Sequence, residues 1–501
     1  MVLLTQLPPE ILHNVLSYVL PEDLPQLCRV CRFLHSYISG NAVLCRDIYY
    51  SVLDLPVSGT DETIDWEQEL KDYIKLKAIC RHRGPEKTKE LGFVHDTVTR
   101  ILKRSPSGEF RESRPVTHSP SRNLEFLRKL FARKHNRVAF LMRSSLFEFA
   151  RGETYRFREP PLPEQQQSAK LHCLFGTAIL RCGRTRSSRM HPYACARVYD
   201  LRRYTQATMW GPFMSDGSGR VDWERVEAVM IVLSQNIRDK NINSSPLFAN
   251  LWKSPFAGSW PNSYVPWPPD REPLSLDDQD PYGVSGTFMR IVCFLDYSDF
   301  FAFNFPLTER SPHDVLPDMP RPALEFEEAT RLILMKLHVT KIEPPGEGDG
   351  KDLPVVHFKG VSRALDGSWD DNANSDIRGT VRLTPEGEVR WTTFSIFDGE
   401  ERWRSEGIQV GGLRSARGVL GHWFDKDYEP HGPCGPTAFW KLSDLDAKSE
   451  RDKIFVYDFL PLLAEDDNDP AASTTVEVED DDDDGDWRDE EEFQHGVSLI
   501  Y

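Results

Sequence analysis

Apolar residues recur every three or four positions through the first fifty residues of the chain. Leu7-Pro8 precedes a segment that is apolar on more than one helical face, at Ile11, Leu12, Val15, Leu16 and Val19. Pro21 ends this predicted helix, and Asp23 can cap a second one with apolar residues at Leu24, Leu27, Val30, Cys31, Leu34 and Ile38. A third apolar group follows at Val43, Leu44, Ile48 and Tyr49. Three helices this short have too small an interior to bury every one of these side chains, so the rest of the chain or another protein must cover the remainder.

Helical periodicity continues in the next part of the chain. Residues 71–143 contain 19 Lys and Arg against 7 Asp and Glu, and their apolar spacing predicts helices with basic outer faces. No finger spacing or aromatic–basic RNA motif accompanies this charge, so we favour a solvated basic face over a nucleic-acid site. Residues 221–237 predict a further helix. Residues 105–121, 159–169 and 243–283, rich in Pro, Ser or Gln, predict loops.

After residue 283 the pattern changes to short apolar runs separated by turn residues. The runs lie at 288–294, 300–305, 332–342 and 355–358, followed by residues 381–383 and 389–396 around a Thr-Pro-Glu-Gly turn. Asp398-Gly399 between two aromatic-rich segments predicts a hairpin turn. Repeated short strands with glycine turns favour a meandering antiparallel sheet or a closed barrel. The fold class expected is therefore α+β, with helices first and a β-rich region after them.

Charge and length change this picture only at the C-terminal end. The chain has 501 residues and a formal charge of −17, of which residues 465–492 carry −15, leaving an ordinary −2 elsewhere. Such an acidic stretch cannot bury itself, so we expect a disordered, solvated tail. No apolar run reaches the ~18 residues of a membrane span, and Pro8 and Pro9 follow the start too soon for a secretory signal. Nine scattered cysteines indicate a reducing compartment, so we expect a cytoplasmic or nuclear protein.

The opening pattern resembles a known domain family. The stretch LPPEILHNVLSYVLPEDLPQLCRVCRFLHSYI is similar to an F-box in its Leu-Pro start, its acid-Ile-Leu helix, its Asp-Leu turn and its L-x-x-V-C-R segment. The resemblance spans about residues 4–50. It implies a trihelical unit that docks on the Skp adaptor of a cullin–RING ubiquitin ligase. In the family, Trp often follows the Leu that corresponds to Leu44. Here Cys45 stands at that position, so it contributes less apolar area to the contact with the adaptor.

This resemblance, with the apolar pattern, predicts the adaptor-binding residues. They are Leu7, Pro8, Ile11, Leu12, Leu16, Leu24, Leu27, Val30, Cys31 and Leu44. The alternative is that the helices pack on their own chain. Cys28 and Cys31 have no second ligand pair at the spacing that zinc requires, so we expect core thiols and no metal there.

The β-rich region is the candidate for target binding. Residues 418–432 resemble F-box proteins of fungal type, and more distantly those whose lipocalin-like β-barrel binds protein C-termini. If a barrel mouth exists, the candidate pocket residues are Arg414, Trp423, Tyr428 and His431. The alternative is that both residues have only structural roles, with Trp423 in the core and His431 in an ordinary turn.

The predicted organisation has four parts: an F-box at 1–50, a basic helical linker at 51–150, a mixed and then β-rich region at 151–463, and a tail at 464–501. Catalytic motifs such as G-x-S-x-G and H-E-x-x-H are absent from the sequence, so we expect no catalytic residue and no cofactor. The function expected is a non-catalytic substrate receptor of a Skp–cullin–F-box ligase, acting on an unidentified target protein. Two alternatives stay open: a β-barrel that binds a small ligand, and an F-box scaffold that acts outside ubiquitylation.

Overall fold

The structure is a computed structural model that describes nine stretches of the chain and one isolated residue. These are residues 4–54, 64–104, 121–150, 163–176, 184–242, 275–305, 321–365, 374–413, 415 and 417–443. The predicted acidic tail, the loop at 105–120 and most of the loop at 243–283 lie outside these ranges. None of the helices within them combines the length and apolar character that a membrane span requires.

The N-terminal unit is helical, as its periodicity predicts. It comprises a 3-10 turn at Leu4–Gln6, α1 (Pro9–Ser17), a 3-10 turn at Pro21–Asp23, α2 (Leu24–Val30), α3 (Arg32–Ile38) and α4 (Ala42–Val52). The predicted second helix is split, because Cys31 is extended and its sulfur accepts the N–H of Leu34 as the cap of α3. Asn41 caps α4 through the Leu44 N–H. Asp23 makes no side-chain cap; the preceding 3-10 turn leads directly into α2.

Helix α5 (Trp66–Arg81) connects this unit to the rest of the molecule. Trp66, Leu70 and Tyr73 are buried in the same apolar cluster as α1–α4. Helix α5 therefore packs into the core of the N-terminal unit. The helices that follow α5 are α6 (Leu91–Lys103), α7 (Arg122–Phe131), α8 (Lys134–Phe140) and α9 (Ser145–Ala150). The sequence prediction of helices in the basic stretch is confirmed within the described residues.

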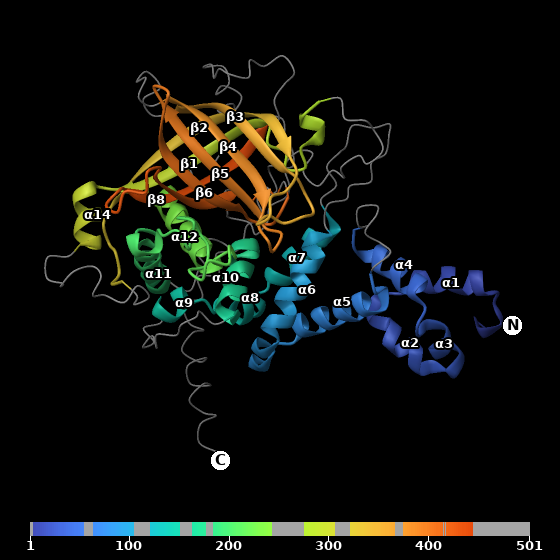
Figure 1. The fold of residues 1–501 in the computed structure, drawn as a ribbon. Coiled ribbons are helices and arrows are strands. Elements are labelled where there is room, and N and C mark those ends of the chain that lie inside the picture. The colour runs from blue at the N-terminus through green and yellow to red at the C-terminus, as the bar shows by residue number, and fades with distance from the viewer. Residues whose placement is uncertain are drawn as a thin grey trace, which may run out of the picture.

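A helical layer lies beneath the barrel (Figure 1). It contains α10 (Pro163–Phe175), α11 (Arg184–Val198) and α12 (Trp223–Asp239). Helix α12 confirms the helix predicted at 221–237 and is buried on most of its surface, between α10, α11 and strands β1, β7 and β8. The prediction of a loop over residues 159–169 is wrong from Pro163 onward, because α10 begins there. Proline is tolerated at the first position of a helix, since its missing N–H would have no partner within the helix.

Eight antiparallel strands form a closed barrel in chain order. They are β1 (Gly286–Leu295), β2 (Glu328–Glu343), β3 (Val355–Ala364), β4 (Asn374–Leu383), β5 (Val389–Phe397), β6 (Glu400–Gln409), β7 (Val419–Asp425) and β8 (Cys434–Ser443). β8 pairs with β1, which removes both free sheet edges. The predicted hairpin at Asp398-Gly399 is confirmed, with both residues at positive φ (50° and 82°). The predicted β-run at 300–305 is wrong. It lies largely in α14 (Tyr297–Asn304), where Asp296 accepts the N–H of Ser298 and caps the helix.

Candidate functional site

The N-terminal helices expose an unusual share of large apolar side chains. Of the twelve large hydrophobic residues that are exposed in the described part of the chain, eight lie within the first 43 residues. We call these eight the exposed apolar set: Leu4, Ile11, Val15, Tyr18, Leu20, Val30, Phe33 and Val43. Apolar surface gathered in one small unit is typical of a protein interaction site, whereas single exposed hydrophobic residues are ordinary.

Helix α1 shows how the sequence produces this surface. Leu12 and Leu16, one turn apart, face inward and are buried in the unit's own core. Ile11 and Val15 have the same spacing but are offset by one residue, so they lie on the outer side, and half of Ile11 is exposed. A helix that is apolar on two sides can pack on its own unit and still present a second apolar side to a partner.

The structure divides the predicted adaptor-binding residues into three groups. Ile11, Pro8 and Val30 are exposed, the last by 67%. Leu7, Leu27 and Cys31 are half-buried against the unit's core. Leu12, Leu16, Leu24 and Leu44 are buried in that core. The last four therefore support the fold of the unit, and Val15, Tyr18, Leu20, Phe33 and Val43 are exposed apolar residues that the sequence prediction left out.

A second candidate site is the interior of the barrel. Strand alternation and register place Phe288, Phe358, Trp391 and Phe439 inside, and their rings meet across the barrel at centroid distances of 5.4–6.1 Å. These rings belong to an apolar cluster that also contains Tyr282, Leu383 and Val389. The end of the barrel where β1 begins is therefore filled with side chains.

A polar layer follows the aromatic one inside the barrel. Inward-facing hydroxyls pair between neighbouring strands: Ser362 with Ser375 at 2.7 Å, and Thr393 with Ser405. Thr437 on β8 donates to the carbonyl of Ile291 at 3.0 Å. Buried hydroxyls on five strands make this half of the interior suited to a polar ligand group.

Arg290 is the charged residue of this layer. It faces inward from β1 and is only 5% exposed, and its Nε donates to the Thr437 hydroxyl at 2.9 Å. No carboxylate pairs with it among the residues that the structure describes. Burial alone lowers the pKa of the guanidinium from 12.5 to about 10. Burying a guanidinium without a carboxylate partner lowers the stability of the fold. Its N–H groups can bind a carboxylate supplied by a ligand.

The side chains at the opposite end of the interior are less completely buried. Val292, Phe294 and Ile333 face inward beside or beyond Arg290 and are only half-buried. Their outward-facing neighbours Ile291 and Cys293 are completely buried under the helical layer. This inverted burial places partly exposed side chains inside the barrel where β1 ends, so a ligand would approach Arg290 from that direction.

The predicted pocket residues do not form one group. Trp423 faces inward, packs edge-on against Trp403 at 5.2 Å and donates from Nε1 to the carbonyl of Cys293 at 2.9 Å. Gly435 allows this contact, since a Cβ there would lie 2.8 Å from the indole nitrogen.

The other members lie outside the interior or beyond the described residues. Tyr428 stacks on Trp210 at 3.7 Å, and His431 is exposed beside Phe305 of the α14 end. Arg414 lies outside the described residues. Arg290 was missed, although a single cationic residue inside the apolar run 287–295 was a visible signal for it.

Comparison with known proteins adds one finding. Residues 4–51 match the family model described as F-box-like. No curated protein and no solved structure matches the chain. The resemblance stated from the sequence is thus confirmed for the N-terminal helices. The eight-stranded barrel that follows later in the chain is established by the strand pairing alone.

Proposed function

We propose, on the premise that residues 4–51 are an F-box-like domain, that the chain is a non-catalytic substrate receptor of a Skp–cullin–F-box ubiquitin ligase. The N-terminal unit would bind the Skp adaptor and, through it, the cullin–RING ligase. The barrel would bind the target protein. The thioester chemistry of ubiquitin transfer would belong to other subunits.

The observation that carries the proposal is the exposed apolar set on a unit that already has its own core. Complete burial of one Val, Leu or Ile side chain contributes ~1.5–3 kcal/mol. Each member of the set is partly shielded in the free chain, so covering it contributes roughly 1 kcal/mol. Several such contributions together can exceed the free-energy cost of association and form a stable heterodimer.

The linker suits the positional role of a receptor. The core of the N-terminal unit continues into α5, and Glu22 forms ion pairs with Lys77 and with Arg81 of that helix. Asp54 at the end of the unit accepts backbone N–H groups of α7 from Arg122 and Asn123. A target held in the barrel would then be presented at a fixed position, which raises its effective concentration near the conjugating enzyme.

For the barrel, we propose that the group bound beside Arg290 is a carboxylate. The guanidinium without a carboxylate partner, the hydroxyl layer and the half-buried side chains where β1 ends support this assignment. A protein target can supply such a group through an acidic side chain or its C-terminus. A small carboxylate ligand is the second candidate function, and the same guanidinium favours it.

The adaptor part of the proposal is tested by co-purification of the full chain with the Skp adaptor and the cullin. We expect wild type to recover both proteins and Val30→Asp to lose them at least tenfold, because the substitution would bury a charge in the interface. Leu276→Asp is the matched control, since Leu276 is also an exposed hydrophobic residue but lies next to the barrel. Equal recovery with both variants would reject the docking assignment, and adaptor binding without cullin would favour the scaffold alternative.

The receptor part is tested separately by proximity labelling with the proteasome blocked. Arg290→Met should retain the adaptor and the cullin but lose labelled target proteins. If the labelled proteins are unchanged while a small bound acid is lost from the purified barrel, the small-ligand function is favoured instead.

A further inference from the structure

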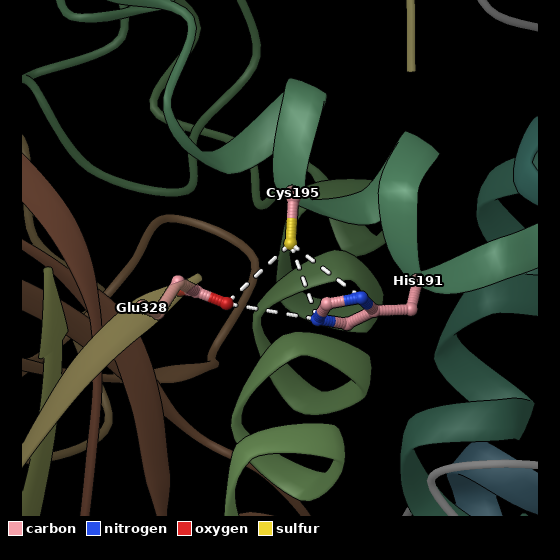
Figure 2. Close-up of side chains that lie close together, drawn as sticks. All are labelled: His191, Cys195 and Glu328. Atoms are coloured by element: carbon pink, nitrogen blue, oxygen red, sulfur yellow. Dashed lines mark hydrogen bonds and ion pairs between the residues drawn. The ribbon is translucent and has the colours of Figure 1, made fainter. Parts of the chain in front are cut away.

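Three metal-ligating side chains meet between the helical layer and the barrel, away from both sites described above. His191 and Cys195 lie one turn apart on α11, and Glu328 is the first residue of β2 (Figure 2). The helical spacing directs both α11 side chains to the same face, where β2 brings the carboxylate. One ligand atom from each residue lies within 4.8 Å of the other two.

The distances between these atoms match those around a single tetrahedral ion. Cys195 Sγ lies 3.2 Å from His191 Nε2 and 3.5 Å from Glu328 Oε2, and Nε2 and Oε2 are 3.6 Å apart. Zinc bonds of about 2.1 Å to nitrogen or oxygen and 2.3 Å to sulfur, at tetrahedral angles, place ligand atoms roughly 3.4–3.6 Å apart. All three separations lie within a few tenths of an ångström of this range.

The surroundings of Glu328 fix one oxygen toward the other two ligands. Its Oε1 accepts the Tyr199 hydroxyl, and its Oε2 accepts the Asn236 amide at 2.7 Å while facing His191 and Cys195. Partners that orient a ligating carboxylate in this way are a regular feature of protein metal sites.

The charge balance also favours a bound cation. The Glu328 side chain is 1% exposed and has no Lys or Arg partner within the described stretches. A carboxylate buried in this way is costly unless a cation compensates it. A divalent ion bound by a carboxylate, a thiolate and a neutral imidazole would leave the group with no net charge.

We propose that His191, Cys195 and Glu328 bind one Zn²⁺ ion, with water at the fourth position. The mixed imidazole, thiolate and carboxylate set suits zinc better than calcium or magnesium, which prefer oxygen ligands alone. The His191 side chain is 20% exposed and supplies the route by which the ion and its water reach the site. The ion joins α11 to the first residue of β2, and so fixes the helical layer against the end of the barrel where β2 begins.

The test is the zinc content of the full-length chain, purified without a histidine tag and dialysed against a weak chelator. We expect close to one equivalent of zinc in wild type and less than a tenth of that in Cys195→Ser and Glu328→Gln. Cys173→Ser is the matched control, because Cys173 is an equally buried cysteine in the helical layer, and it should retain the full equivalent. Less than a tenth of an equivalent in wild type supplied with micromolar zinc would overturn the proposal, as would equal zinc in all four proteins.

Two further measurements guard against variants that do not fold. His191→Ala changes the most exposed of the three ligands and should lose the metal while its circular dichroism and gel-filtration profile stay as in wild type. In wild type itself, Co²⁺ should produce a thiolate-to-cobalt charge-transfer band. A cobalt complex without that band would show that Cys195 is not a ligand, and would overturn the proposed set.

Discussion

Replacing Arg290 by Met should make the protein more stable while it removes the proposed ligand site. Arg290 lies inside the barrel with a single hydroxyl partner, Thr437. The fall of its pKa from 12.5 to about 10 corresponds to roughly 3 kcal/mol of unfavourable free energy for the charged form. This cost is constant below pH 10, where the side chain is charged in both the folded and the unfolded chain, and it is relieved only as the pH rises from 10 to 12.5.

The substitution to Met removes this cost and leaves little unpaired. Thr437 keeps its hydrogen bond to the carbonyl of Ile291. The lost Arg290 hydrogen bond is worth about 1 kcal/mol. We therefore expect Arg290→Met to raise the free energy of unfolding by ~1–2 kcal/mol, as replacement of other buried charges by apolar side chains has done.

Arg417 provides a matched control that should lack this gain in stability. It has the same exposure as Arg290, 5%, and the same pKa, lowered to about 10 by burial. Its guanidinium, however, donates to the backbone carbonyls of Cys173 and Gly176, and Arg417→Met would remove both hydrogen bonds. Each buried carbonyl that loses its partner costs ~1–3 kcal/mol, and this cost opposes the ~3 kcal/mol gained by removing the buried charge. Arg417→Met should therefore be less stable than Arg290→Met, and up to ~3 kcal/mol less stable than wild type.

Equilibrium urea denaturation, followed by tryptophan fluorescence and near-ultraviolet circular dichroism, measures both effects. The comparison is valid if the dependence of the unfolding free energy on urea is the same in all three proteins. A loss of more than 1 kcal/mol in Arg290→Met would refute the reasoning, because it would mean that the folded chain already compensates the guanidinium. The carboxylate site would then have no basis.

Three other outcomes follow from the burial pattern. Changing Ile11, Val15 and Val30 together to Ala should weaken the proposed binding to the Skp adaptor about 100-fold, because ~3 kcal/mol of apolar contact is lost. Titration calorimetry that finds less than a threefold change would contradict this. Leu12→Ala, at a position only 1% exposed, should instead destabilise the N-terminal unit by ~2–5 kcal/mol, seen as lost helical circular dichroism; an unchanged melting curve would reject its core role. Burial holds the pKa of His422 well below 6.5, so between pH 6.5 and 5 only the unfolded chain binds a proton at this residue. The free energy of unfolding should therefore fall by up to ~2 kcal/mol over this pH range. His422→Phe should flatten that part of the stability profile, and an identical profile in wild type and variant would contradict the assignment.

The local elements were largely predictable because periodicity reports which residues face a common core. The helical spacing at 221–237 identified α12, and the turn Asp398-Gly399 identified the β5–β6 hairpin. The run at 300–305 failed because consecutive aromatic residues fit a strand or a short helix equally well. The cap at Asp296 decided for the helix there.

The sequence by itself determined the helical N-terminal unit and its F-box-like character, the change from helix to strand near residue 283, and the series of short strands that follows. Only the tertiary structure decided which of Ile11 and Leu12 faces outward, that Arg290 points into the interior, and that Glu328 meets His191 and Cys195. The physical reason is distance along the chain. Periodicity and turn chemistry act over a few residues. Glu328, which meets Cys195, and Thr437, which meets Arg290, each lie more than a hundred residues away and reach these partners only when the barrel closes on its helices.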